Sequence, residues 1–154
     1  MDTVINASPL IFLHKIDRIN LLEKIFNTVY IPDAVINEVK VGNAAKAKKL
    51  LDCVPHEVIT VSNRTAVLGL LGRLHVGEVE VIVGAIEKDI KLVVLDDSYA
   101  RNKAKQLQLE VAGTLGILLR AQEMGFIDDI HYDIKRLKDA GMYISDKLLE
   151  TIYS

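Results

Sequence analysis

The chain of 154 residues has no tryptophan, a single cysteine and almost no net charge. The one cysteine, Cys53, excludes an internal disulfide and a cysteine-based zinc site. With 19 Lys and Arg against 21 Asp and Glu, the net charge is −2, which excludes proteins that bind nucleic acid through bulk positive charge. Half of the residues are hydrophobic, which excludes a disordered chain. We expect a folded protein of a reducing compartment.

Signals for export and membrane insertion are also missing. The first residues, Met1 to Val4, include an acid and lack the positive and apolar regions of a signal peptide. No apolar run approaches the ~20 residues that cross a bilayer. The sequence therefore predicts a cytoplasmic protein with no membrane partner.

Several motifs that identify enzymes are absent as well. Neither G-x-G-x-x-G nor G-x-x-x-x-G-K-[ST] occurs, so the usual sites for dinucleotides and nucleoside triphosphates are disfavoured. The four histidines lack the spacing of a helical zinc pair, and Ser8 lacks the glycines of a nucleophile elbow. The chemistry must come from other side chains.

Short β-rich runs alternate with amphipathic helical patterns along the chain. This alternation predicts one α/β domain over residues 1–154, with a mostly parallel sheet of about five strands covered by helices. The expected strands are 3–5, 28–31, 57–61, 91–95 and 110–112. The expected helices are 9–15, one starting at Pro32, 44–51, 65–74, one from Gly77 with Val79, Ile82, Val83 and Ile86 turned inward, 98–107 capped by Ser98, 114–125, 128–139 and 145–152.

Polar residues follow three of the expected strands, where open parallel sheets bind their ligands. They are Asn6 and Ser8, Asp96 and Asp97, and Gly113 and Thr114. Each has an ordinary alternative role, because Ser8 and either aspartate could simply cap a helix.

Two glutamates add carboxylates from helices. Glu38 interrupts the apolar pattern of residues 35–39, and Glu78 directly follows Gly77 at a helix start. Singly, each reads as a solvated helix residue. Together with Asp96, they could converge on Mg²⁺ or Mn²⁺, which prefer oxygen ligands.

Five segments in order resemble the PIN domain. They are Thr3-Val4-Ile5-Asn6-Ala7-Ser8-Pro9-Leu10, Glu38, Leu74-His75-Val76-Gly77-Glu78-Val79-Glu80, Leu95-Asp96-Asp97-Ser98-Tyr99-Ala100-Arg101, and Gly113-Thr114-Leu115-Gly116 followed by Met142-Tyr143-Ile144-Ser145. The D-D-x-x-A-R element is similar to that of a prokaryotic branch of the family. The resemblance extends over nearly the whole chain.

The resemblance implies a three-layer α/β/α sandwich and a Mg²⁺- or Mn²⁺-dependent endoribonuclease, often the toxin of a VapC-type toxin–antitoxin pair. It implies that Glu38, Glu78 and Asp96 are catalytic. It also implies that these three bind the metal together with Asn6 and with Asp97 as a neighbour. Asn6 departs from the family pattern, which has Asp at this position, so a neutral amide oxygen replaces a charged one.

RNA contacts are predicted beside these acids. Arg101 and Lys105 share a helix face at i, i+4 spacing and suit phosphate contacts, with Ser8 as a polar helper. A solvated face, or an ion pair between Arg101 and Asp97, is the alternative. A second basic stretch, between Lys40 and Lys49, contains no acid. Few aromatic residues are present, so no platform for stacking bases is evident.

Three functional hypotheses follow. The first is the RNA-cleaving enzyme, paired with itself as a homodimer and blocked by an antitoxin protein if it is a toxin. The second is a catalytically inactive PIN-fold module that binds RNA or a protein, motivated by Asn6. The third, a phosphate-accepting receiver domain, is disfavoured because the first strand ends in Asn6 and not in a phosphorylatable Asp.

Overall fold

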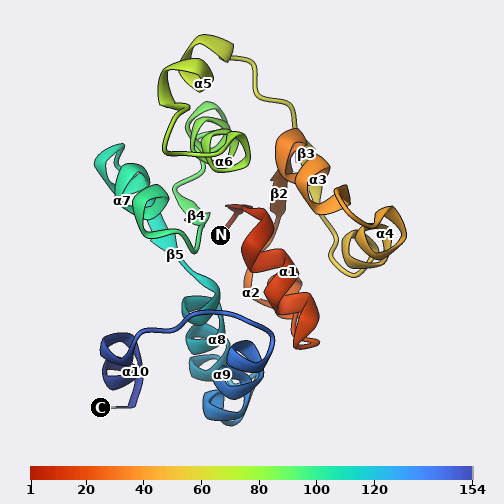
Figure 1. The fold of residues 1–154 in the computed structure, drawn as a ribbon, viewed down its shortest axis with the longest axis vertical. Helices are drawn as coiled ribbons and strands as arrows, with labels where there is room; N and C mark the ends of the chain where they lie inside the picture. The colour runs from red at the N-terminus through yellow and green to blue at the C-terminus, as the bar shows by residue number, and fades with distance from the viewer. Residues whose placement is uncertain (154) are drawn as a thin grey trace.

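The computed structural model describes residues 1–153 and consists of five strands with helices packed around them (Figure 1). The strands are β1 (Thr3–Ile5), β2 (Val29–Pro32), β3 (Glu57–Ile59), β4 (Leu92–Val94) and β5 (Glu110–Ala112). The helices are α1 (Ala7–Lys15), α2 (Leu21–Ile25), α3 (Asp33–Lys40), α4 (Ala44–Asp52), α5 (Arg64–Leu70), α6 (Val76–Glu87), α7 (Ser98–Gln106), α8 (Thr114–Glu123), α9 (Ile130–Asp139) and α10 (Asp146–Tyr153).

The five strands form one parallel sheet in the order β3-β2-β1-β4-β5. In its register, Ile5 pairs with Val94, and Val94 pairs with Ala112. The residues that follow β1, β4 and β5 therefore emerge at the same edge of the sheet. The predicted parallel sheet and the three-layer α/β/α sandwich are confirmed.

The interior of the sandwich is aliphatic, as the shortage of aromatic residues predicts. All three residues of β4 are buried, which fits a central strand covered on both faces. Helix α6 packs against β1, β2 and β4, and α7 packs against β5. Helices α1, α3 and α4 pack against one another. Figure 1 places α5 at one end of the long axis and α8, α9 and α10 at the other.

Several expected boundaries differ from the structure. Strand β3 ends at Ile59, two residues early, and α5 ends at Leu70 because Gly72 takes a left-handed conformation (φ 137°). The short helix α2 was not expected. Ile86, expected to face inward, is 50 % exposed, because it lies in the last turn of α6, where the helix leaves the sandwich.

Two helix starts also differ. Helix α6 begins at Val76, one residue before Gly77. Asp97, not Ser98, caps α7, because its carboxylate accepts a hydrogen bond from the Ala100 backbone N–H at 2.9 Å. Of the two adjacent aspartates, Asp97 therefore has the capping role. Within residues 1–153, no helix combines the length and the apolar character needed to span a membrane.

Candidate functional site

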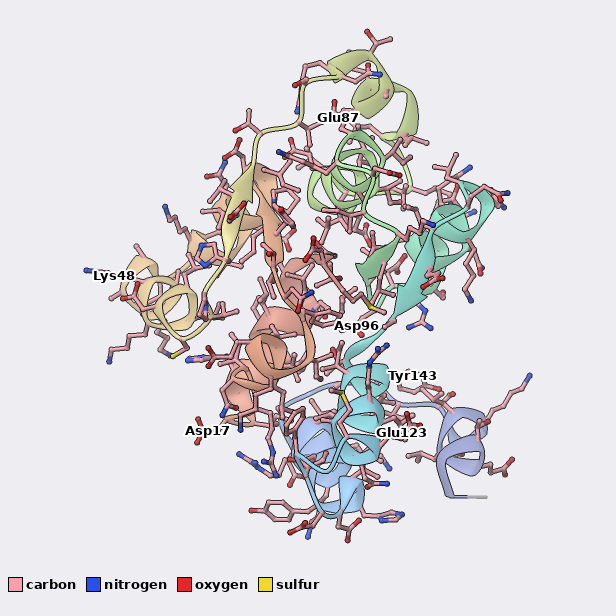
Figure 2. All side chains as sticks on the ribbon, turned by 180° about the vertical axis from the view of Figure 1, so that it is seen from behind. Asp17, Lys48, Glu87, Asp96, Glu123 and Tyr143 are labelled. Atoms are coloured by element: carbon pink, nitrogen blue, oxygen red, sulfur yellow. The ribbon has the colours of Figure 1, made fainter. Side chains whose placement is uncertain are left out.

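A cleft of about 1010 Å³ lies at the sheet edge where β1, β4 and β5 end. In Figure 2, Asp96 lies in the middle of the molecule, where β4 and β5 end. Seven of the eight predicted site residues line this cleft: Asn6, Ser8, Glu38, Glu78, Asp96, Asp97 and Arg101. Their roles in metal and RNA binding stay predictions.

Asp96 is held rigidly by donors from two other elements. Its Oδ1 accepts a hydrogen bond from the Thr114 backbone N–H at 2.8 Å. Its Oδ2 accepts from the Thr114 hydroxyl at 2.7 Å and from the Ser8 hydroxyl at 3.1 Å. Thr114 is fully buried, so its hydroxyl cannot rotate away into solvent. Ser8, predicted to contact RNA, therefore orients Asp96 in this structure.

The Asn6 side chain brings an oxygen without a partner into the cleft. Asn6 is buried (6 % exposed), and its Oδ1 has no hydrogen-bond donor within the described chain. A Cβ on Gly77 would lie 3.4 Å from this oxygen and 3.6 Å from Glu38 Oε1. The bare Cα of Gly77 thus leaves a small space bordered by two oxygens. An unpartnered buried oxygen is costly, so the space is suited to a group that binds oxygen.

Glu78 is a buried carboxylate at the start of α6. Its Oε1 accepts a hydrogen bond from the His75 backbone N–H at 3.0 Å, which completes a capping box. Burial raises the pKa of Glu78 despite this hydrogen bond, and the charges of Asp97 and Glu38 raise it further. The charges of Asp97 and Glu38 therefore act on Glu78 within this cleft.

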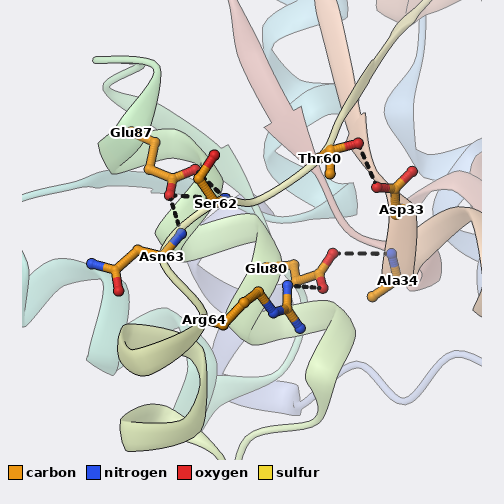
Figure 3. A network of polar contacts seen from close by, with 8 residues as sticks. All are labelled: Asp33, Ala34, Thr60, Ser62, Asn63, Arg64, Glu80 and Glu87. Carbon is orange, nitrogen blue, oxygen red and sulfur yellow. Dashed lines mark hydrogen bonds and ion pairs between the residues drawn. The ribbon is translucent and has the colours of Figure 1, made fainter.

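A second buried carboxylate fixes the helix that carries Glu38. Glu80 Oε1 accepts from the Ala34 backbone N–H at 3.1 Å, and Oε2 accepts from Arg64 Nη1 at 2.9 Å (Figure 3). Ala34 lies in the first turn of α3, so Glu80 ties α3 to α6. Glu38 and Glu78 lie on these two helices, and Glu80 sets their relative position.

Arg101 lies against Gly113 at the floor of the cleft. Its Nη1 donates to the Leu95 carbonyl oxygen at 3.3 Å. A Cβ on Gly113 would come within 2.5 Å of that nitrogen and 3.0 Å of Asp96 Oδ1. The guanidinium therefore reaches the carboxylate region only because residue 113 is a glycine.

Gly113→Ala is expected to displace Arg101 and disturb Asp96. We expect a loss of about 1–2 kcal/mol of stability, seen as a fall in the melting temperature of about 2–8 °C. Gly116→Ala is the matched control, since its Cβ would lie 3.5 Å from Ala112 Cβ, an ordinary contact, and alanine favours a helix. Equal melting temperatures for the two variants would contradict the close packing at Gly113.

The raised pKa of Glu78 predicts a pH-dependent cost to stability. Because the folded-state pKa lies above the unfolded value, the cost is absent at low pH and appears as the pH rises through the folded pKa. Glu78→Gln removes the charge and retains an oxygen for the His75 N–H. In metal-free buffer, the melting temperature of the variant should therefore rise relative to that of the wild type as the pH rises from about 4 to 7. A difference that stays constant with pH would contradict this account.

The donors at this end of the cleft suit a hard divalent cation. They are carboxylate and amide oxygens, with no sulfur, and they include the unpartnered Asn6 Oδ1. Within residues 1–153, no three side chains of Asp, Glu, His or Cys stand together as a ready-made metal site. Glu38 is exposed, so side-chain rotation can bring its carboxylate closer. The residues therefore fit Mg²⁺ or Mn²⁺ in their chemistry.

Of the two basic residues predicted to contact RNA, Arg101 lines the cleft and Lys105 does not. Lys105 lies one turn beyond Arg101 on α7, is exposed and is not among the residues lining the cleft. Figure 2 places Lys48, in the other basic stretch, on α4 and far from Asp96. The alternative pairing of Arg101 with Asp97 is not observed among the described residues, where Arg101 binds the Leu95 carbonyl. Arg101 is therefore the basic residue at this site.

Two functional side chains were missed. His75, one of the four histidines without the spacing of a zinc pair, lines the cleft, and its backbone N–H donates to Glu78. Thr114 was identified only as a residue following a strand, yet it donates two hydrogen bonds to Asp96. The Gly-Thr pair after β5 was the available signal for Thr114, because both a bare Cα and a hydroxyl occur where the strand meets the cleft.

The chain is similar to known proteins both in its sequence and in its fold. A family model described as PIN domain matches residues 2–154. A solved structure of a PilT N-terminus domain protein from the hyperthermophilic archaeon Sulfolobus solfataricus P2 is similar to 80 % of this chain and 95 % of its own, with a TM-score of 0.59 and 24 % identity. That level of identity supports a shared fold alone. No curated protein matches the chain.

Proposed function

This chain belongs to the PIN domain family, and from that premise we propose that it is a divalent-cation-dependent ribonuclease that hydrolyses RNA phosphodiesters. The family has a nuclease-like fold. The observation that carries the proposal is the buried Asn6 Oδ1, which lacks a donor and borders the same space as Glu38 Oε1. Asn6 and Glu38 line one cleft together with Glu78 and Asp96.

Glu38, Glu78 and Asp96 would hold the cation, with Asn6 adding a neutral oxygen and Asp97 lying beside them. When bound, Mg²⁺ or Mn²⁺ supplies an activated water and neutralises charge on the phosphate. Without a cation, burial disfavours the charged form of Glu78 and raises its pKa, and the charges of Asp97 and Glu38 raise it further. A cleft that is lined by several carboxylates, one of them buried, is suited to binding positive charge.

The other residues position the groups that touch the substrate. Thr114 and Ser8 fix both oxygens of Asp96. Glu80 holds α3 against α6 and so places Glu38 opposite Glu78. Arg101 lies at the cleft floor beside Asp96 and provides guanidinium donors for a phosphate oxygen. Contacts of this kind orient the strand and carry little sequence information.

The direct test is the hydrolysis of labelled single-stranded RNA by the purified protein. We expect cleavage with added Mn²⁺, products carrying a 5′-phosphate, and loss of cleavage in EDTA. Cleavage that is unaffected both by EDTA and by Glu78→Ala would contradict the mechanism, because a contaminating or metal-independent activity would then be responsible.

A PIN-fold module that only binds RNA or a protein is the second candidate. The neutral Asn6 favours it, because an amide binds a divalent cation less strongly than a carboxylate does. It predicts RNA binding without cleavage at any Mn²⁺ concentration. The role of a toxin blocked by an antitoxin protein and the homodimer belong to the first candidate. The toxin role predicts growth arrest when the protein is expressed, and relief of that arrest by Glu78→Gln. The homodimer is tested by the mass of the protein in solution.

A further inference from the structure

The same cleft continues beyond the carboxylates into an apolar wall. Its residues come from α8, from the segment after α9 and from α10, and they include Leu115, Leu119, Met142, Tyr143 and Leu148. Asp96 and Arg101 line the other part of the cleft. Tyr143 lies near the carboxyl end of β5, close to the start of α8, in the view of Figure 2. One continuous cavity thus joins an acidic end, a single arginine and an apolar wall.

Tyr143 is presented to solvent by a well-defined backbone turn. Helix α9 ends in a Schellman motif, in which Gly141 (φ 101°) donates to the Lys138 carbonyl and Met142 donates to the Leu137 carbonyl, each at 3.0 Å. The side chain of Ile144 is buried (8 % exposed), whereas that of Tyr143 is 89 % exposed. The backbone is therefore anchored on both sides of Tyr143, whose ring lines the cleft and is open to solvent.

We propose that this apolar wall binds a nucleobase of a single-stranded RNA, with the ring of Tyr143 as the stacking surface. The inference rests on the proposed function, since the phosphate next to that base would lie at Arg101 and the carboxylates. Stacking of a base on an aromatic ring contributes substantially to binding and tolerates any sequence. An exposed phenol ring beside a wall of leucine and methionine side chains offers that surface.

The arrangement of charge favours a nucleic acid over a protein partner. A ligand in this cleft meets apolar side chains at one end, and Arg101 with several carboxylates at the other. An RNA strand repeats apolar base faces and anionic phosphates along its length, so one strand satisfies both ends once a cation is bound. An apolar protein helix would leave Glu38, Asp96 and Asp97 against an uncharged surface.

The absence of tryptophan makes the proposal directly measurable. Tyr143→Trp introduces the one indole in the protein, and its fluorescence reports contacts at that position. We expect quenching, with Mn²⁺ present, by a short single-stranded oligoribonucleotide whose linkages are made non-hydrolysable, so that the cation is bound and the strand is not cut. An abasic strand of equal length should give little quenching. Equal quenching by the two strands, or none by either, would overturn the proposal.

Affinities measured by fluorescence anisotropy of labelled RNA provide the second readout. Tyr143→Ala and Tyr143→Leu should weaken binding by about 5- to 100-fold, and Tyr143→Phe should restore it to near the wild-type value. The matched control is Tyr132→Ala, which removes a tyrosine on α9 that is 64 % exposed and outside the cleft. Unchanged RNA affinity in Tyr143→Ala would overturn the proposal and favour a protein partner.

The nuclease activity and the stacking site at Tyr143 can be rejected independently. Base-dependent quenching without any RNA cleavage would support the stacking site and reject the nuclease. Cation-dependent cleavage that Tyr143→Ala leaves unchanged, in both KM and kcat, would retain the nuclease and reject the stacking site.

Discussion

Replacing Glu78 by Gln is expected to lower Mn²⁺-dependent RNA cleavage by roughly 100-fold or more. The change removes a buried anionic ligand, and about 3 kcal/mol of lost stabilisation corresponds to that factor. The His75 backbone N–H can still donate to the amide oxygen, so the start of α6 is retained. Initial rates at saturating RNA, measured over a range of Mn²⁺ concentrations, give the effect.

A thermal shift measurement separates this role from a structural one. At a Mn²⁺ concentration about 100 times above its Kd, the free energy of unfolding of the wild type should rise by about 2.7 kcal/mol. Its melting temperature should then rise by roughly 5–10 °C. Glu78→Gln should gain far less. In metal-free buffer it should melt higher than the wild type, because a buried charge is removed and its repulsion by Asp97 and Glu38 is relieved. Glu123→Gln, an exposed glutamate on α8 outside the cleft, is the control. Equal Mn²⁺ shifts in all three proteins would reject Glu78 as a ligand.

Asn6→Asp is expected to strengthen Mn²⁺ binding by about 10- to 100-fold. That factor corresponds to about 1.4–3 kcal/mol, the net gain that remains when the attraction of the added charge to the cation is offset by the cost of desolvating the carboxylate. In an impaired enzyme, the cleavage rate at limiting Mn²⁺ should rise in parallel. Without metal the variant should melt lower than the wild type, since a further carboxylate is then buried near Glu38 and Glu78.

The same variant distinguishes the two proposed functions. Tighter Mn²⁺ binding by calorimetry with no cleavage of any RNA would favour the inactive binding module. Asn102→Asp, which adds the same charge at an exposed position of α7, is the control. If both variants bind Mn²⁺ equally well, the position of Asn6 has no special relation to the cation.

The arrangement of the sheet was predictable because hydrophobic patterning carries it. The run from Leu92 to Leu95 is long enough to identify a strand buried on both faces, and alternation with helices then requires a parallel sheet. The carboxyl ends of such strands share one edge. For that reason the sequence also indicated that Asn6 and Asp96 would lie near each other.

What the sequence could not predict depends on contacts between distant side chains. The pattern of α6 does not reveal that Glu78 stays buried in a capping box while Glu80 binds the first turn of α3. The hydrogen bonds from Thr114 to Asp96 join residues 18 positions apart. Nor does the sequence show that the ring of Tyr143 is exposed to solvent. Its place beside Leu148 in the cleft follows only from how the chain turns after α9. Ile152, a further apolar residue near the C-terminus, has a side chain that lies outside the described part.

The pairing of β1 with β4 fixes the backbone of Asn6 independently of its side chain. The Asn6 backbone N–H donates to the Val94 carbonyl at 3.1 Å, so the main chain at position 6 is held by the sheet and not by its own side chain. Asn and Asp have the same shape, and their codons differ by a single base. One nucleotide substitution can therefore exchange a neutral side chain for an anionic one at position 6, in a cleft that already holds four carboxylates. A series of Asn, Asp, Ser and Ala at this position would vary the charge and the donor atoms of the cleft while the fold remains constant.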